Sequence, residues 1–324
     1  MHAIVVSETG GPDVLTYSEV PAPTPLDSEV LVNVLVAGIN YIDTYYREGI
    51  YTQTTPFIPG LEGVGRVAFD PRGEIAPGTM VAWDHAFGSY AEQVCVDRSR
   101  LVAVPDTIDV TVAGTMLLQG MTAHYLANSV YQLAPGSTCL ITAGAGGVGL
   151  ILTQMAKHLG AEVISVVSTE EKERLAHDAG ADHVLRYCED LADRVRSLND
   201  GQGVDVVYDG VGKDTFFASL ATVRPRGVVC LFGAASGPVP PIDPQLLNQH
   251  GSIFLTRPSL NAYTADPAEF QLRAQAVVNM VASGDLRIHV SASYPLADAA
   301  TAHRDLQARG TTGSIVLAVN SSES

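Results

Sequence analysis

The stretch TCLITAGAGGVGLILTQMAKHLG, residues 138–160, decides the fold of this chain. It opens with an apolar run of β type, continues with glycines in the spacing G-x-G-x-x-G, and ends with the apolar spacing of a helix. This order is the context in which the motif binds a dinucleotide, because glycines let the backbone approach a pyrophosphate and the helix N-terminus offers unpaired N–H groups. The residues expected to hold the pyrophosphate are Gly144, Ala145, Gly146, Gly147, Val148 and Gly149.

The end of the next β-type run, AEVISVVS, indicates which dinucleotide is bound. An Asp or Glu about twenty residues after the glycines would accept hydrogen bonds from the ribose of NAD. The run ends instead in Ser168 and Thr169, with Lys172 just beyond. A hydroxyl and an ammonium suit a 2′-phosphate, so the pattern favours NADPH, and we expect Glu170 and Glu171 to point to solvent. The alternative is that Lys172 is a surface lysine paired with a glutamate.

Strand and helix patterns alternate from Ser137 onward and predict an α/β domain with a doubly wound parallel sheet of Rossmann type. The expected strands are TCLITAG, AEVISVVS, HVLRY, VDVVYDGV, GVVCLFGA and SIFLTRPS. Residues 1–118 contain short β-type runs cut by Gly and Pro, and the last residues add two helices and a strand, SIVLAV, that can return to this first part. We therefore expect a β-rich domain over 1–118 and 257–324 and a nucleotide domain over 119–256.

Composition narrows the class of protein. The 324 residues carry 19 Lys and Arg against 35 Asp and Glu, a net charge of −16, with no basic run. Such a surface repels phosphate backbones, so nucleic acids and anionic membranes are not expected partners. The four cysteines are more than 40 residues apart and no zinc-ligand spacing is present. Without a signal peptide or a long apolar segment, we expect a soluble, cytoplasmic protein.

The segment GINYIDTYYREGIY, which begins at Gly38, holds four of the twelve tyrosines of a chain that is only 6% aromatic. Each buried phenol, amide or carboxylate must find a partner or cost about 1–3 kcal/mol. The segment is therefore either a solvated turn or the lining of a site for a flat molecule with polar edges. Asp43 and Arg47 are four residues apart and predict an ion pair on a helical turn. We expect Tyr41 and Tyr46 to pack or to face solvent.

These motifs resemble the zinc-independent quinone oxidoreductase branch, which includes zeta-crystallin, of the medium-chain dehydrogenase/reductase superfamily. The resemblance covers nearly the whole chain and rests on GINYIDTYYREGIY, PGLEGVG, AGAGGVGL, VVYDGVG, TRPSL and ARGTTGSIVL, in the order of the family. Zinc-dependent members carry Gly-His-Glu where this chain has Gly60-Leu61-Glu62, and AGIN stands in place of the first cysteine ligand. The four-cysteine zinc loop is also missing. The resemblance thus implies no metal, a GroES-like fold for the β-rich domain, and a homodimer formed through SIFLTRPS.

The resemblance also implies roles for single residues. By this resemblance, the nicotinamide and the acceptor are contacted by Asn40, Tyr45 and Tyr51, and the nicotinamide ring also lies near Thr122. The resemblance gives the adenosine phosphate and adenine end to Ser168, Lys172 and Tyr187, and the nicotinamide side or phosphates to Phe232, Gly233 and Arg309. Glu62 is expected to accept backbone N–H groups. His85, His124, His158 and His303 are expected to be surface or packing residues. Residues 66–90 are fewer than in the family, which leaves the size of the substrate open.

The implied activity is transfer of a hydride from NADPH to a quinone held by the tyrosines, with proximity as the main source of catalysis. Tyr45, Tyr51 or water are the alternatives for a proton donor. An NADPH-dependent reductase of enals and enones, acting on an activated carbonyl substrate, is a second possibility on the same scaffold. A non-catalytic NADPH-binding sensor or a crystallin-like protein is a third.

Overall fold

The computed structural model describes residues 1–319, which form two compact units. The nucleotide unit is Gly120–Thr264, and the β-rich unit is Met1–Gln119 together with the described residues from Ala265 onward. The helix α3 (Met116–Tyr125) contains the first boundary between them. Within the described residues, no helix combines the length and the apolar character that crossing a membrane requires.

The nucleotide unit contains the expected doubly wound sheet. Its strands are β8 (Thr138–Thr142), β9 (Glu162–Val167), β10 (His183–Arg186), β11 (Val204–Asp209), β12 (Val223–Leu231) and β13 (Phe254–Thr256). They pair in parallel in the order β10-β9-β8-β11-β12-β13. In chain order within the unit this is 3-2-1-4-5-6, the order of a Rossmann sheet. The six strands expected from the sequence are confirmed.

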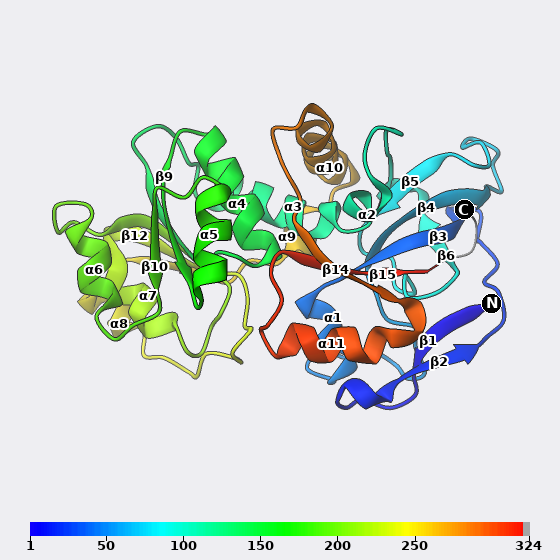
Figure 1. Cartoon of the computed structure of the whole chain (residues 1–324), viewed down its shortest axis with the longest axis horizontal. Helices are drawn as coiled ribbons and strands as arrows, with labels where there is room; N and C mark the ends of the chain where they lie inside the picture. Colours follow the sequence, from blue (N-terminus) through cyan, green and yellow to red (C-terminus); the bar gives the residue numbers. More distant parts are fainter. Residues whose placement is uncertain (320–324) are drawn as a thin grey trace. The chain divides into compact units, whose positions relative to one another are not determined.

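Helices cover both faces of this sheet. The helices of the unit are α4 (Gly147–His158), α5 (Glu170–Asp178), α6 (Leu191–Ser197), α7 (Phe216–Thr222), α8 (Gln245–Gln249) and α9 (Leu260–Tyr263), with a π-helical turn over Leu126–Val130. The helices α4 and α5 lie on one face, and α6 and α7 lie on the other (Figure 1). Five of the six side chains of β9 are buried, as is typical of a strand covered on both faces.

The β-rich unit is built on a seven-stranded sheet in the order β14-β15-β3-β4-β5-β7, in which β6 also pairs with β3. Its strands are β3 (Glu29–Ile39), β4 (Glu62–Phe69), β5 (Met80–Trp83), β6 (Gln93–Asp97), β7 (Leu101–Ala103), β14 (Val290–Pro295) and β15 (Ser314–Ala318). A separate hairpin consists of β1 (His2–Val6) and β2 (Leu15–Glu19). The strand SIVLAV does return to the first part of the chain, because β15 pairs antiparallel with β3. The strand β14 was not expected.

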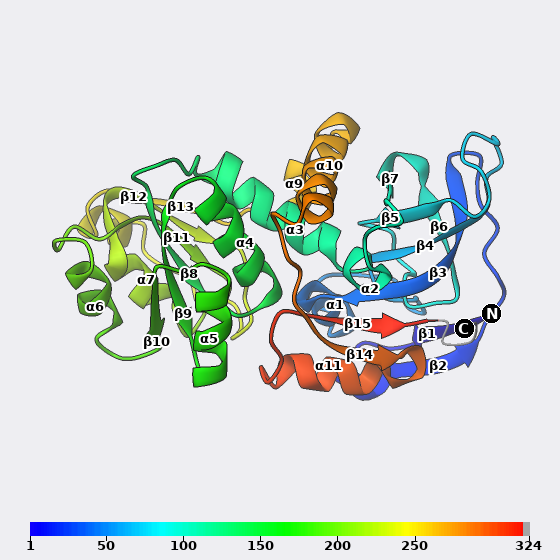
Figure 2. The same cartoon turned by 45° about the horizontal axis from the view of Figure 1, so that its top comes forward.

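The helices of the β-rich unit are α1 (Tyr41–Arg47), α2 (Val110–Ala113), α10 (Pro267–Ser283) and α11 (Ala299–Gln307). Short 3-10 turns occupy Pro12–Val14, Arg98–Arg100 and Leu296–Asp298. Figure 2 shows α11 beside β14 and β15. The strand β4 contains glycines because it passes close to its neighbour: a Cβ on Gly65 would lie 2.2 Å from the Asn33 carbonyl oxygen.

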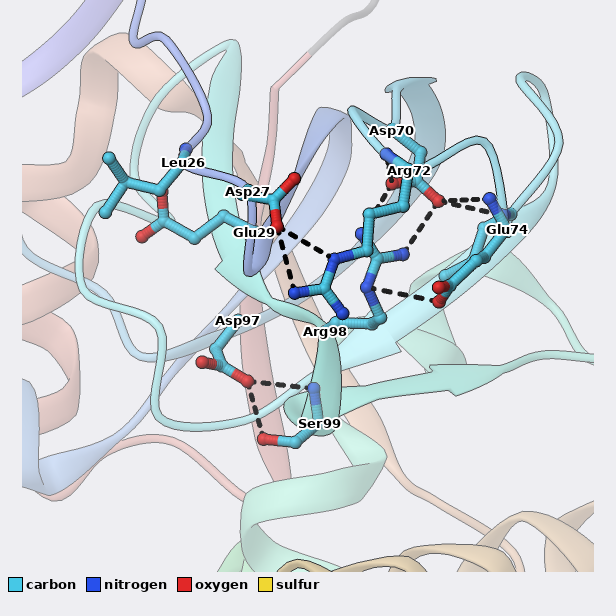
Figure 3. A network of polar contacts seen from close by, with 10 residues as sticks. Leu26, Asp27, Glu29, Asp70, Arg72, Glu74, Asp97, Arg98 and Ser99 are labelled. Carbon is cyan, nitrogen blue, oxygen red and sulfur yellow. Dashed lines mark hydrogen bonds and ion pairs between the residues drawn. The ribbon is translucent and has the colours of Figure 1, made fainter.

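The turn expected in FDPRGEIAPG is fixed by the carboxylate of Asp70 (Figure 3). Asp70 accepts hydrogen bonds from the backbone N–H groups of Arg72 at 3.0 Å, Glu74 at 2.9 Å and Ile75 at 2.8 Å. The Arg98 guanidinium donates to both of its oxygens, at 2.7 and 2.6 Å. These bonds, first of all the one from Arg98, hold the pKa of Asp70 well below its usual range. The polar cluster thus fixes the turn between β4 and β5 and ties it to the 3-10 turn that begins at Arg98.

Candidate active site

The glycine turn after β8 has the geometry that phosphate binding requires. A Cβ on Gly144 would lie 1.7 Å from Ser165 Oγ, and one on Gly149 would lie 2.4 Å from the Ala143 carbonyl oxygen, so neither position accepts a side chain. The turn leads into α4, a helix of 12 residues. Its first N–H groups, those of Gly147, Val148 and Gly149, have no acceptor within residues 1–319. Three adjacent free donors at a helix N-terminus are a site for an anion.

The residues expected at the adenosine phosphate lie at the ends of β9 and β10. Ser168 follows β9 and is exposed, and Lys172 is half-buried in the first turn of α5. Tyr187 follows β10, and its hydroxyl accepts the Ala143 N–H at 2.8 Å. The acidic side chains at the start of α5 are exposed, as expected: Glu170 and Glu171. Tyr187 therefore links the end of β10 to Ala143, the residue before the glycine turn.

Asp209, at the end of β11, was not singled out from the sequence. Its side chain is fully buried. Its carboxylate accepts from Thr142 Oγ1 (3.1 Å), Val211 N (2.9 Å), Gly212 N (3.1 Å), Thr215 Oγ1 (2.8 Å) and Ser219 Oγ (2.7 Å). Because Thr142 ends β8, this bond joins the two strands between which the order of the sheet reverses, where ligands of such folds bind. The signal in the sequence was an Asp at the carboxyl end of an apolar strand.

The other cofactor candidates of the nucleotide unit lie at two places. The N–H groups of Phe232 and Gly233 donate to the Asp209 carbonyl oxygen at 2.9 and 3.2 Å, which fixes the backbone after β12. A Cβ on Gly233 would lie 2.4 Å from the Gly210 carbonyl oxygen, so this close approach requires glycine. Thr122 is buried in α3.

In the β-rich unit, the tyrosine segment folds as α1 because its first residues form a capping box. The Asn40 N–H donates to Asp43 Oδ2 at 2.8 Å and so satisfies a donor that precedes the helix. Tyr41, Tyr45 and Tyr46 lie on this helix, and the Tyr51 N–H returns to the Tyr45 carbonyl oxygen at 3.1 Å. The segment is therefore a short helix with a tight return, not a solvated turn.

The side chain of Asn40 is held by partners on both sides. Its Nδ2 donates to Glu62 Oε1 at 2.6 Å, and its Oδ1 accepts from Gln119 Nε2 at 3.0 Å. Glu62 Oε2 accepts the Leu118 N–H at 2.9 Å, the structural role expected for it. Burial raises the pKa of Glu62 to about 8, against the opposing effect of these hydrogen bonds. The Asn40 amide thus has one fixed orientation.

A second buried network replaces the expected ion pair between Asp43 and Arg47, which the structure does not contain. Arg47 pairs with Glu48 instead, at 2.5 Å, and its NH1 donates to His303 Nδ1 at 3.2 Å. Since Nδ1 accepts, His303 Nε2 carries the hydrogen and donates to Tyr90 Oη at 3.2 Å. The Tyr90 hydroxyl donates to Asp43 Oδ2 at 2.9 Å. The predicted pair does not form because Arg47 has other partners, the adjacent Glu48 and the distant His303, while Asp43 Oδ2 accepts from the distant Tyr90.

Burial controls the ionisation of this network. It raises the pKa of Asp43 to about 7 and lowers the pKa of His303 to about 3, where the neighbouring Arg47 adds to the effect. Neutral His303 is consistent with the hydrogen-bond directions above. His303 is fully buried, as expected of a packing residue, and its hydrogen bond with Arg47 also joins α11 to α1.

The tyrosines expected at the acceptor are brought together. The rings of Tyr45 and Tyr51 meet edge to face at 5.5 Å, and those of Tyr46 and Tyr51 do the same at 5.5 Å. Within residues 1–319 the Tyr51 hydroxyl has no hydrogen-bond partner. Tyr41 is half-buried, and its side chain is hydrogen-bonded to that of Arg309. Arg309 lies in the exposed turn before β15 and has φ of 57°. The helix α1 therefore connects four of the expected site residues. Asn40 caps it, Tyr45 lies on it, and Tyr51 and Arg309 are hydrogen-bonded to its residues.

Comparison with known proteins decides the family. Residues 26–135 match the alcohol dehydrogenase GroES-like domain, and residues 147–266 match the zinc-binding dehydrogenase family. A quinone oxidoreductase of Pseudomonas aeruginosa is 42% identical over 315 residues, which are 95% of this chain and 96% of that protein. The chain belongs to the quinone oxidoreductase branch of the medium-chain dehydrogenase/reductase superfamily. The expected GroES-like and Rossmann domains are thereby confirmed.

Two further proteins are similar to this chain over nearly its whole length. A mycobacterial protein solved in complex with NADPH is 50% identical, with a TM-score of 0.96 over 98% of this chain and 100% of that chain. The 2-haloacrylate reductase of a Burkholderia species is 38% identical over 97% of this chain and 98% of that protein. Among residues 1–319, no group of three or more His, Cys, Asp or Glu side chains is arranged to hold a metal ion.

Proposed function

We propose that this protein is an NADPH-dependent quinone oxidoreductase. The observation that carries the proposal is the glycine turn, whose three free N–H donors suit a pyrophosphate, in a chain 42% identical to a quinone oxidoreductase. NADPH is proposed over NADH because Ser168 and Lys172 stand where NAD-binding proteins carry an acidic residue, and a 50% identical protein was solved with NADPH.

The cofactor contacts we propose divide by chemistry. The pyrophosphate is assigned to the turn from Gly144 to Gly149, and the 2′-phosphate and adenine to Ser168, Lys172 and Tyr187. The nicotinamide side is assigned to Asn40, Tyr45, Thr122, Phe232, Gly233 and Arg309. When bound, NADPH supplies the hydride, and the protein supplies position and charge. The Tyr187 hydroxyl accepts the Ala143 N–H, which places this side chain beside the glycine turn and supports its assignment to the same ligand.

On the acceptor side, we propose that Asn40, Tyr45 and Tyr51 orient the quinone. The Asn40 amide is locked by Glu62 and Gln119, and Tyr51 has a hydroxyl that is free to donate to a quinone oxygen. Holding two reactants in contact can supply several kcal/mol of a barrier, on the order of 7–11 in favourable cases. Proximity and one or two hydrogen bonds are therefore sufficient for a reducible acceptor.

Oxidation of NADPH by the purified, chelator-treated protein tests this function, with a simple quinone as acceptor and NADH as the control. We expect rapid turnover with NADPH and the quinone, and a large preference over NADH. Tyr45→Phe and Tyr51→Phe should lower kcat/KM by about tenfold or less, as for one lost hydrogen bond. A loss of about a thousandfold would identify a proton donor. The matched control is Tyr17→Phe, an exposed tyrosine stacked on His2 in the same unit.

Reduction of an activated alkene is the second candidate, because a 2-haloacrylate reductase is 38% identical to this chain. An enal and a 2-haloacrylate offered in the same assay separate the two functions, since turnover with these alone would move the assignment. Binding of NADPH without any turnover would indicate a sensor or crystallin-like role. We also propose a cytoplasmic homodimer formed through the edge strand β13. Light scattering after gel filtration would give twice the mass of one chain.

A further inference from the structure

The loop of residues 84–89, between β5 and β6, begins with a buried carboxylate paired with a histidine. Asp84 is fully buried, and its Oδ2 lies 2.5 Å from Nδ1 of His85. Among residues 1–319 the Asp84 side chain has no other hydrogen-bond partner, because its Oδ1 is buried without one. An ionised carboxylate in such a place requires a paired positive charge. His85 is the residue that can supply this charge.

The loop holds His85 in a strained conformation. Its φ of 66° lies in the left-handed region, which is unfavourable for a residue other than glycine. On the C-terminal side, the Ala86 N–H donates to the Leu61 carbonyl oxygen at 3.0 Å. Further along, Ser89 Oγ accepts from Trp83 Nε1 at 2.9 Å. Strain that the surrounding structure maintains in this way is characteristic of a functional segment.

The carboxylate of this pair lies beside the residue that fixes the Asn40 amide. Trp83 pairs with Gly63 in the antiparallel register of β4 and β5, so Asp84 follows opposite Glu62. Glu62 accepts from Asn40 Nδ2 at 2.6 Å. Burial raises the pKa of Glu62, and the nearby charge of Asp84 adds to this effect. The start of the loop is therefore close to one part of the proposed acceptor site.

The same loop contacts the tyrosines that are proposed to hold the acceptor. The ring of Phe87, two residues after His85, meets the Tyr46 ring edge to face at 4.8 Å. Tyr46 in turn meets Tyr51 at 5.5 Å. The loop that carries His85 therefore adjoins both parts of the proposed acceptor site, the Asn40 amide and the tyrosines.

We propose that His85 is the proton donor of the reaction and that Asp84 is the positioning residue that orients it and balances its charge. The inference rests on the proposed function and assigns the proton that the cofactor does not supply. With Nδ1 donating to Asp84, the second ring nitrogen, Nε2, carries the proton that is transferred. A histidine oriented by a buried carboxylate is an arrangement that enzymes use for proton transfer.

Reduction of a quinone by a hydride needs one further proton. The hydride turns the quinone into a hydroquinone monoanion, and NADPH becomes NADP⁺. The His85 Nε2–H bond then breaks as an O–H bond forms, which yields hydroquinone and neutral His85. The side chain of His85 is 16% exposed, so water can return a proton to it for the next cycle.

Two substitutions separate proton transfer from a structural role, in steady-state oxidation of NADPH by phenanthrenequinone. Asparagine and glycine both accept the positive φ of this position, so His85→Asn and His85→Gly keep the backbone but remove the proton donor. Each should lower kcat/KM for the quinone about a hundredfold, the lower end of general acid catalysis, because water partly replaces the donor.

Added imidazole should raise kcat/KM of His85→Gly at least about tenfold, because the missing side chain leaves room for a free proton donor. It should leave the parent protein and His85→Asn unchanged. The dissociation constant of NADPH, from a fluorescence titration, should stay within about twofold in every variant. The matched control is His2→Asn, at an exposed histidine of the same unit that is paired with Glu92 at 3.3 Å.

The outcomes distinguish the two proposals. A parent protein that does not oxidise NADPH with the quinone overturns the proposed function and this inference with it. A parent protein that turns over, with a kcat/KM that His85→Asn leaves unchanged, overturns the role of His85 alone. A loss in His85→Gly that imidazole does not restore, or an equal loss in His2→Asn, also contradicts it. Thermal unfolding midpoints of the variants confirm that each is folded at the assay temperature.

Discussion

Replacing Glu62 by Gln should remove a specific pH dependence of stability. Glu62 is fully buried, and burial raises its pKa from 4.5 to about 8. A carboxyl whose pKa is higher in the folded state binds more protons folded than unfolded. Its stabilising contribution is therefore complete below about pH 4.5 and is lost as the pH rises toward 8. The amide side chain of the Glu62→Gln variant cannot ionise, so the variant lacks this loss.

The size of the effect follows from the shift. Each pKa unit corresponds to about 1.4 kcal/mol, and between about pH 5 and pH 9 the ionisation of Glu62 costs the folded state about 4 kcal/mol. At about pH 5 the variant and the parent should differ by about 1 kcal/mol or less, since both carry a neutral side chain at this position. At about pH 9 the variant should be the more stable protein by about 3–4 kcal/mol. Asp43, whose pKa is raised to about 7, contributes a similar slope to both proteins.

Urea unfolding followed by tryptophan fluorescence measures this directly. Trp83 is the single tryptophan, is fully buried, and pairs in register with Gly63, the residue after Glu62. It therefore reports the unfolding of the sheet that holds Glu62. Glu19→Gln, at an exposed glutamate, is the matched control and should follow the parent protein at every pH. Curves for Glu62→Gln and the parent that stay parallel from about pH 5 to pH 9 would refute the reasoning.

Three further changes test the nucleotide unit. Gly149→Ala should weaken NADPH binding at least about tenfold in a fluorescence titration, because its Cβ would lie 2.4 Å from a backbone oxygen, whereas Gly11→Ala has open space and should bind normally. Asp209→Asn should lower the free energy of unfolding by about 2–4 kcal/mol in urea, since one acceptor oxygen of a fully bonded buried carboxylate becomes a donor; no loss would contradict this. Ser165→Ala should be neutral or stabilising by up to about 1 kcal/mol in the same assay, because Ser165 Oγ is buried without a partner among the described residues; a large loss would show that the hydroxyl is needed.

The sequence by itself determined the nucleotide unit. Apolar runs, the spacing of glycines and the alternation of strand and helix are local properties, and they predicted the strands of the parallel sheet. The same patterns also predicted which residues directly follow these strands, such as Ser168 after β9 and Tyr187 after β10. The motif also determined where a phosphate has free donors, because the start of a helix leaves N–H groups unpaired wherever it occurs.

The tertiary structure decided the partners of the polar and aromatic side chains. The register of β3 and β4 pairs Gly38 with Glu62, and this brings the Asn40 amide to a carboxylate 22 residues away. The expected ion pair of Arg47 with Asp43 is absent because Arg47 contacts the adjacent Glu48 and also His303, 256 residues away, while Asp43 accepts from Tyr90, 47 residues away. Phe87 joins the tyrosines only through the fold of its loop. A hydrogen bond or ring contact between remote segments depends on sheet register and loop geometry, and the local pattern of residues carries neither.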